Sequence, residues 1–281
     1  MMLINGIATE QLQATDRGLQ YGDGLFETVA VVDGQPRLWR EHMARLAYGC
    51  QRLQIPLPDS ALLLQEAQQL CADQPRAILK IIITRGSGGR GYRIPETTEA
   101  TRLLAIHPWP AYPDSHYQQG ITLMVCHTRL GSNPALAGIK HLNRLEQVLA
   151  RSEWQGSDID EGLMRDLHGD VIEGTMSNLF IIEDETLITP DLAQCGVNGV
   201  MRERVLALAA ELGITTRVET VSLTRLKAAS ACFVTNSIIG LWPVRALGGI
   251  NYEQGKIMHD LIDALVQTLD EPRLATVTSN A

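Results

Sequence analysis

Lysine is scarce in this sequence, which makes each lysine a candidate for chemistry. The 281 residues contain Lys80, Lys140, Lys227 and Lys256. Lys140 lies in the apolar stretch 136–142 (LAGIKHL), and apolar surroundings lower the pKa of a lysine because they disfavour its charged form. A neutral lysine amine attacks carbonyl carbons. Lys140 is therefore a candidate nucleophile, with a surface charge as the alternative, whereas Lys80 is expected on the exposed side of a sheet edge.

Two further charged residues have apolar neighbours. Glu173 follows Val171 and Ile172 and precedes Gly174, so it ends a short apolar strand. Such a carboxylate could pair with a ring nitrogen in a buried site, or it could be an exposed turn residue. Arg45 belongs to a predicted helix with apolar neighbours, where an exposed arginine is the alternative to a binding role.

A helix start and a strand end have the composition of an anion site. Residues 196–202 (GVNGVMR) open a predicted helix, and glycines before a helix leave backbone N–H groups free where the helix dipole is positive. Residues 235–237 (TNS) end a predicted strand with three short hydrogen-bonding side chains. Together they could form a phosphate cup, and an ordinary turn and an ordinary strand end are the alternatives.

The loop 85–92 (RGSGGRGY) is too rich in glycine for a packing element, and its arginines suit a substrate carboxylate. It lacks the spacing and the strand-to-helix context of a nucleotide-binding loop. The seven histidines show no i, i+4 pair and no nearby cysteine pair, so no metal site is expected. The absence of a G-x-S-x-G motif argues against a serine hydrolase.

The elements that position these residues follow from hydrophobic spacing. A strand is expected at 26–34, ending in a hairpin turn at Asp33 and Gly34. Apolar residues at three- and four-residue spacing predict a helix at 41–53, which Pro56 prevents from continuing. Further elements expected in this half are a helix at about 60–72, capped by Ser60, and strands at 77–84 and 102–107. This order indicates an α+β fold.

Residues 108–120 contain three prolines and no strong hydrophobic period, so a linker is expected at 113–120. It would separate a small N-terminal α/β domain, 1–112, from a larger strand-rich C-terminal domain, 121–281. Elements expected in the second domain are strands at 121–126, 162–166, 178–182, 186–189 and 231–235, and helices at about 142–154, 199–212 and 253–269.

Composition excludes several classes of protein. The chain is 45% hydrophobic and 20% charged, as globular proteins are, and its formal charge of −8 argues against nucleic-acid binding. The N-terminus lacks a basic segment followed by a long apolar run, and no stretch reads as a membrane span. The five cysteines are scattered, as expected of reduced thiols. These features predict a cytoplasmic protein.

Three segments, in this order, resemble signatures of the fold-type IV pyridoxal-phosphate enzymes. They are 16–28 (DRGLQYGDGLFET), 42–46 (HMARL) and 173–180 (EGTMSNLF), and the match in order and spacing runs from residue 3 to about 247. This family includes branched-chain and D-amino-acid aminotransferases and aminodeoxychorismate lyase. The resemblance implies a two-domain fold like that of the D-amino-acid aminotransferases, and a homodimer with its sites near the interface.

The resemblance also implies residue roles for pyridoxal 5'-phosphate (PLP). Lys140 occupies the position of the lysine that carries the cofactor covalently, and Glu173 that of the carboxylate facing the pyridine nitrogen. The positions that hold the cofactor phosphate correspond to Arg45, the backbone amides of Val200 and Met201, and Ser237. Arg90 corresponds to the position where D-amino-acid aminotransferases hold a substrate carboxylate.

Two further segments, 85–92 (RGSGGRGY) and 136–149 (LAGIKHLNRLEQVL), resemble the lyase of bacterial folate synthesis. The implied reaction converts 4-amino-4-deoxychorismate to 4-aminobenzoate and pyruvate, with Lys140 as the base. An aminotransferase acting on branched-chain or D-amino acids would use the same cofactor residues and is the alternative within the family. A non-catalytic homologue that binds a phosphate ligand or a partner is the alternative of a different class.

Overall fold

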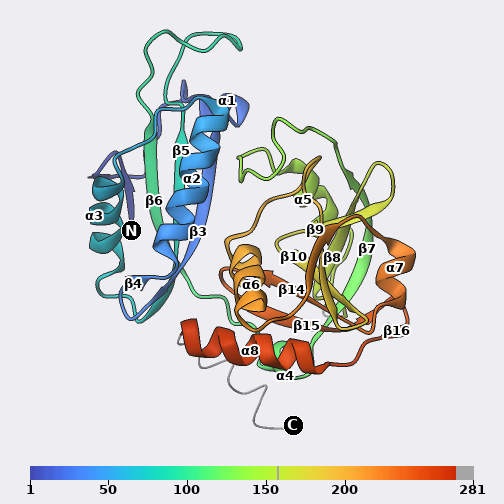
Figure 1. Cartoon of the computed structure of the whole chain (residues 1–281). Coiled ribbons are helices and arrows are strands. Elements are labelled where there is room, and N and C mark those ends of the chain that lie inside the picture. The colour runs from blue at the N-terminus through green and yellow to red at the C-terminus, as the bar shows by residue number, and fades with distance from the viewer. Residues whose placement is uncertain (157, 270–281) are drawn as a thin grey trace. The chain divides into compact units, whose positions relative to one another are not determined.

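The computed structural model describes residues 1–156 and 158–269, which form two compact units, each with its own sheet (Figure 1). The first unit comprises residues 1–110 and 139–143, and the second comprises 111–138 and the described residues from 144 onward. The expected linker at 113–120 belongs to the second unit, where helix α4 (Ser115–Gln118) buries Tyr117. A proline-rich segment is therefore folded into a unit because one aromatic side chain anchors it.

The first unit contains a six-stranded sheet whose pairings are all antiparallel, in the order β2-β1-β6-β5-β3-β4. Its strands are β1 (Met2–Ile4), β2 (Ile7–Ala8), β3 (Gly24–Val32), β4 (Gln35–Pro36), β5 (Arg76–Thr84) and β6 (Thr101–Pro108). The expected hairpin between β3 and β4 is confirmed. Asp33 and Gly34 have φ values of 50° and 73°, and this left-handed conformation at both positions is what a two-residue hairpin turn requires.

Helices α2 (Trp39–Leu53) and α3 (Ser60–Cys71) cover one face of this sheet, and the short α1 (Arg17–Tyr21) precedes β3. Alternation along β3 directs Leu25 and Glu27 toward α2, where both are buried, and leaves Phe26 half-buried on the other face. The expected cap of α3 was wrong by one residue. Asp59 caps this helix, because its Oδ1 accepts a 2.8 Å hydrogen bond from Ala61 N.

The second unit contains a ten-stranded mixed sheet. Its strands are β7 (Ile121–Leu130), β8 (Glu161–Asp166), β9 (Asp170–Gly174), β10 (Asn178–Glu183), β11 (Thr186–Pro190), β12 (Thr216–Glu219), β13 (Val221–Ser222), β14 (Ala231–Asn236), β15 (Gly240–Leu247) and β16 (Ile250–Asn251). Pairing proceeds from β10 through β14, β15, β7 and β8 to β9, and Glu173 on β9 pairs with Asn178 on β10. This last pairing closes the six strands into a ring.

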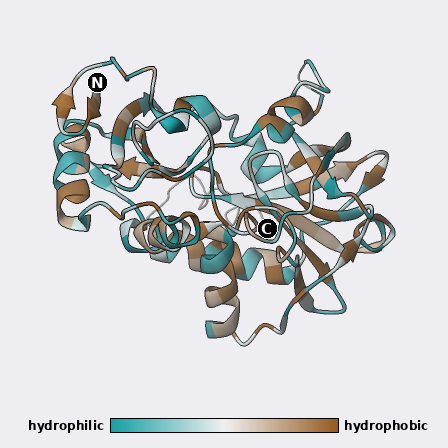
Figure 2. Cartoon of the chain, turned by 90° about the horizontal axis from the view of Figure 1, so that it is seen from above, coloured by the Kyte–Doolittle hydropathy of each residue, from teal (hydrophilic) through white to brown (hydrophobic). Residues whose placement is uncertain are grey.

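Strand β15 was not expected from the sequence because Pro243 lies in its middle, and proline cannot donate to a sheet ladder. Pro243 nevertheless lies opposite Phe233 of β14, and the strand is buried along most of its length. The remaining helices are α5 (Leu145–Arg151), α6 (Val200–Glu211), α7 (Leu223–Ala228) and α8 (Lys256–Leu269). Hydropathy colouring shows brown concentrated on strands and helix stripes and teal on many loops (Figure 2). No helix within residues 1–156 and 158–269 is long and apolar enough to cross a membrane.

Candidate active site

Lys140 belongs to the first unit because its segment pairs with the start of β3. Phe26 N donates a 2.9 Å hydrogen bond to Lys140 O, and Leu142 N donates a 3.0 Å bond to Gly24 O. The Lys140 Nζ lies 4.4 Å from the centre of the Phe26 ring, on the sheet face opposite α2 and α3. The main chain therefore fixes the lysine at a strand edge, half-buried against an aromatic ring.

Lys80 contacts the same ring. Its Nζ lies 5.1 Å from the centre of the Phe26 ring. The expectation that Lys80 marks a sheet edge was wrong, since β5 pairs with β3 on one side and with β6 on the other. The face of the sheet that carries Phe26 therefore presents two lysine amines to one aromatic ring.

Arg45 lies in α2 and binds the buried carboxylate of Glu27 on β3. Arg45 Nε donates a 2.8 Å hydrogen bond to Glu27 Oε1, and Arg45 Nη2 pairs with Glu27 Oε2. His42 Nδ1 lies 2.7 Å from the same Oε2. Burial raises the pKa of Glu27, but the charge and hydrogen bonds of Arg45 and His42 outweigh it and lower this pKa to about 2. Arg45 is thus not the exposed arginine that the alternative predicted.

The two arginines of the glycine-rich loop differ in environment. Arg85 is buried and donates to Asp23 and to the backbone oxygens of Leu53 and Gln54. Arg90 is exposed, and its side chain makes no hydrogen bond to the residues that the structure describes. Of the two, Arg90 is the one whose guanidinium is available to a ligand.

In the second unit, Glu173 is buried at the point where the ring of strands closes. Its exposed fraction is 4%, which contradicts the alternative of an exposed turn residue. Glu173 Oε2 accepts a 2.8 Å hydrogen bond from Val197 N and lies 3.5 Å from Asn178 Nδ2. Asn178 Nδ2 also donates to Val197 O at 2.8 Å. Two side chains therefore tie the loop before α6 to the ends of β9 and β10.

The start of α6 lies next to this cluster. Gly199 is the N-cap residue, so no side chain caps the first-turn amides of Val200 and Met201. A Cβ on Gly199 would come within 2.0 Å of Asn178 Oδ1, so a larger residue would displace the Asn178 amide. Arg202 Nη1 donates a 2.9 Å bond to Asn198 Oδ1 and holds the first turn in place. An uncapped helix start with fixed geometry is a suitable anion site.

The turn after β14 adds hydroxyl groups. Ser237 is half-buried in a turn that Asn236 Oδ1 organises by accepting from Ile238 N and Ile239 N. Thr235, which lies opposite Asn178 in the sheet, has a buried Oγ1 without a hydrogen-bond partner among the described residues. Buried polar atoms without partners indicate a missing ligand or water. The donors in this part of the second unit therefore fit a phosphate group.

The predicted residues thus fall into two groups. The first unit holds Lys140 and Arg45 through β3, and the second unit gathers Glu173, Ser237 and the start of α6 at neighbouring strand ends. Asn178, which had no predicted role, pairs with Glu173 on one side and with Thr235, a member of the possible phosphate cup, on the other. Its position at an expected strand end, close in sequence to predicted site residues, could have identified Asn178 as a candidate site residue.

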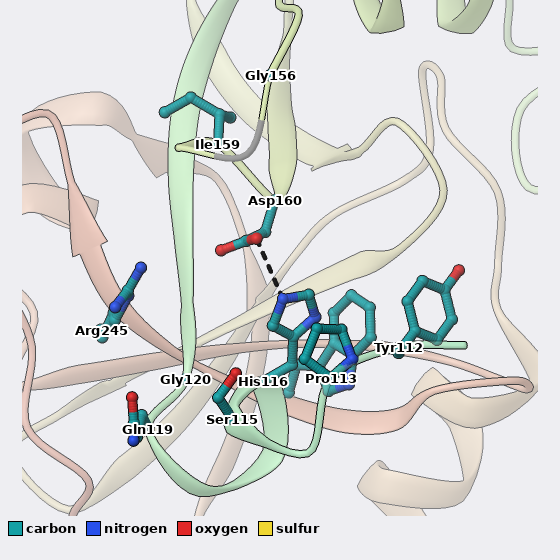
Figure 3. A pocket seen from close by; sticks show the side chains of 11 residues that line it. Tyr112, Pro113, Ser115, His116, Gln119, Gly120, Gly156, Ile159, Asp160 and Arg245 are labelled. Atoms are coloured by element: carbon teal, nitrogen blue, oxygen red, sulfur yellow. Dashed lines mark ion pairs between the residues drawn. The ribbon is translucent and has the colours of Figure 1, made fainter. Parts of the chain in front are cut away.

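A separate pocket of about 440 Å³ lies in the second unit, and none of the predicted site residues lines it (Figure 3). Asp160 Oδ1 lies 3.1 Å from His116 Nε2, while its Oδ2 accepts from Thr122 N at 2.8 Å. Arg245 Nε donates to Thr122 Oγ1 at 3.0 Å. These polar groups bind one another within the wall of the pocket. The candidates for the active site are therefore the two groups of residues described above.

Known proteins share this fold and much of this sequence. An aminodeoxychorismate lyase from Vibrio harveyi is 38% identical over 257 residues, which are 92% of this chain and 94% of that protein. A branched-chain-amino-acid aminotransferase from Escherichia coli K12 is 29% identical over 259 residues, 88% of this chain and 83% of that protein.

The crystal structure of 4-amino-4-deoxychorismate lyase from Pseudomonas aeruginosa has 48% identity and a TM-score of 0.93, and the match covers 96% of this chain and all of that one. The expected two-domain fold-type IV architecture is confirmed. Residues 24–247 match the model of the amino-transferase class IV family. The chain therefore belongs to the amino-transferase class IV family.

Proposed function

We propose that this protein is a PLP-dependent lyase that converts 4-amino-4-deoxychorismate to 4-aminobenzoate and pyruvate. The observation that carries the proposal is the similarity to lyases over nearly the full length of both chains, at 38% and 48% identity. The aminotransferase of E. coli K12 is less similar, at 29%. The lyase-like segments 85–92 and 136–149 favour the same assignment.

The residues present fit the cofactor. The uncapped start of α6, the turn at Ser237 and the unpartnered Thr235 Oγ1 supply donors suited to a phosphate. In the proposed site, the amides of Val200 and Met201, Ser237 and Arg45 hold this phosphate, and the buried carboxylate of Glu173 faces the ring nitrogen. When bound, PLP is an electron sink for the carbon that bears the substrate amine.

Lys140 performs the proton transfers in this proposal. Its amine would hold the cofactor, and in the presence of substrate it would accept the proton from the carbon that bears the substrate amine. Loss of the enolpyruvyl ether from the neighbouring carbon makes the ring aromatic. Return of the proton to the enolpyruvyl group gives pyruvate, and the proposal assigns this delivery to Lys140 as well. Arg90 is assigned to a substrate carboxylate.

The proposed assembly is a homodimer, and the proposed location is the cytoplasm. Helix α5 presents Leu145, Val148 and Leu149 to solvent in the single chain, with exposed fractions of 76%, 61% and 58%. Clustered exposed apolar side chains on a helix favour burial against another protein surface, and closed twofold pairing is the commonest assembly. Light scattering that found an active monomer at low concentration would exclude the dimer.

A coupled assay tests the function directly. Aminodeoxychorismate is generated enzymatically, the purified protein is added, and pyruvate is measured together with 4-aminobenzoate. Equal amounts of both products are expected. Transfer of the amino group to a keto acid without release of pyruvate would instead support the aminotransferase alternative. If the purified protein shows neither the absorbance of bound PLP at the edge of the visible range nor any turnover, the non-catalytic alternative is supported.

A further inference from the structure

A buried carboxylate outside the residues assigned above lies at the start of β8. Glu161 has an exposed fraction of 1% and forms no ion pair with the described part of the chain. Burying a charge without a counter-ion is unfavourable unless hydrogen bonds replace its lost hydration. Glu161 therefore depends on hydrogen-bond donors from neighbouring residues.

Glu161 accepts hydrogen bonds from the turn that connects β9 to β10. Its Oε1 accepts from Thr175 N at 3.1 Å and from Thr175 Oγ1 at 2.6 Å, in addition to Gly162 N at 2.8 Å. Its Oε2 accepts from Ser177 Oγ at 2.9 Å and from Met176 N at 3.3 Å. One carboxylate therefore binds three consecutive residues of the turn through backbone amides and hydroxyls.

The turn packs directly on this carboxylate. A Cβ on Gly174 would lie 2.3 Å from Ser177 Oγ and 2.9 Å from Glu161 Oε2, so a side chain does not fit there. Gly174 N also donates a 2.7 Å bond to Ser177 O, which closes the turn. The conformation of residues 174–177 thus depends on the carboxylate that fills the space beside them.

The two residues that flank this turn are Glu173 and Asn178. They pair across β9 and β10, and both bind Val197 in the loop before α6. We propose that Glu161 is a positioning residue, which anchors the 174–177 turn and thereby holds Glu173 and Asn178 in place. The inference rests on the proposed function in one respect, namely that Glu173 faces the cofactor.

The other end of β8 offers a matched control. Asp166 Oδ1 accepts 2.9 Å hydrogen bonds from His168 N and Asp170 N, so it organises the turn between β8 and β9. Glu161 and Asp166 are thus carboxylates on one strand that each shape a turn. Only the turn bound by Glu161 adjoins Glu173 and Asn178 directly.

The test compares Glu161→Ala and Asp166→Ala with the unmodified protein. Amide hydrogen exchange, followed by mass spectrometry, reports on the peptides that cover 173–178 and 196–199, and a titration gives the dissociation constant for PLP. Glu161→Ala is expected to accelerate exchange in both peptides and to weaken PLP binding roughly tenfold to a hundredfold. Asp166→Ala should leave both readouts within about twofold, even if it lowers the melting temperature equally.

Equal effects of the two variants on PLP binding, or unchanged exchange at 173–178 in Glu161→Ala, would overturn the inference. If Glu161→Ala does not fold, Thr175→Val and Ser177→Ala remove single hydroxyl donors and should shift both readouts in the same direction by a smaller factor. Unchanged readouts in both would also overturn it. If the unmodified protein does not bind PLP, the proposed function fails, and the exchange measurement still decides whether Glu161 positions the turn.

Discussion

Glu27 and Glu161, the buried carboxylates beside the candidate site residues of the two units, are satisfied in different ways. In the first unit, Glu27 binds the side chains of Arg45 and His42. In the second unit, Glu161 and Asp166 accept from backbone amides, and Glu161 also accepts from hydroxyls. An ion pair ties one side chain to another, whereas a carboxylate bound to amides shapes the main chain. The first unit therefore fixes Arg45 directly through its side chain, and the second fixes the turn that Glu173 and Asn178 flank.

The largest expected effect tests the chemistry of the first unit. Replacing Lys140 with alanine removes the proposed cofactor-binding amine and base, so turnover should fall by about a thousandfold or more. Lys140 is only half-buried, so circular dichroism and the melting temperature should change little. Pyruvate release measures turnover.

Lys80→Ala is the matched control, because Lys80 contacts the same Phe26 ring. It should retain most of the activity and the cofactor absorbance. Comparable losses in the two variants would show that the aromatic contact, and not the chemistry of Lys140, underlies the effect.

Glu173→Gln tests the second unit. The amide can still accept from Val197 N, so the fold and cofactor binding should persist. The rate should nevertheless fall by roughly a hundredfold, because the carboxylate proposed to keep the ring nitrogen protonated is lost. Steady-state kinetics together with the cofactor absorbance check this, and an unchanged rate would remove Glu173 from its assigned role.

The pH dependence of stability separates the two kinds of carboxylate. The pKa of Glu27 falls from 4.5 to about 2 in the folded protein, so its stabilising effect is present above about pH 4.5 and is lost as the pH falls toward 2. This pKa shift corresponds to a contribution of about 3 kcal/mol to the free energy of unfolding. Burial raises the pKa of Glu161, so the sign is opposite and its contribution to stability declines as the pH rises above 4.5.

Urea unfolding of Glu27→Gln and the unmodified protein between about pH 6 and about pH 2.5 measures the contribution of Glu27, because this contribution declines as the pH falls below 4.5. The variant should be less stable at the higher pH, and the gap should narrow on acidification. A gap that stays constant would contradict the assigned pKa shift.

The smallest expected effect concerns the exposed loop of the first unit. Arg90→Ala should raise KM for aminodeoxychorismate by roughly tenfold, the scale of one charge-assisted hydrogen bond, while the cofactor absorbance stays. Arg93 is the control, since it is exposed on the same loop and pairs with Glu96. If Arg93→Ala raises KM equally, the loop attracts substrate through general charge and Arg90 has no specific role.

The parts of the fold with strong local patterns were predictable. Strand β3 alternates buried and half-buried residues and ends in Asp33-Gly34, so its hairpin could be read from the sequence. Strand β15 could not be predicted, because Pro243 suggests a break in regular structure. Only the pairing of β15 with neighbouring strands explains why a strand forms there. The expected linker contains helix α4 for the same reason. Tyr117 of this helix is buried against residues distant in sequence, such as Trp242.

The candidate site divides in the same way. Lys140 and Glu173 stand out because a charge in an apolar run is visible locally. Glu27 and Glu161 do not, since their side-chain partners lie 15 to 18 and 14 to 16 residues away in the chain. Sequence spacing reveals the residues proposed to carry chemistry more readily than the residues that bind or position them.

The first unit is not synthesised as one continuous segment, because residues 139–143 belong to it. They complete the edge of β3 beside residues 24–26, but they leave the ribosome only after 111–138, which belong to the second unit. Until Lys140 and Leu142 emerge, the start of β3 lacks these edge hydrogen bonds, and an unpaired strand edge is open to aggregation with other nascent chains. The segment that carries Lys140 is thus also the one that completes the hydrogen bonding of the first unit during translation.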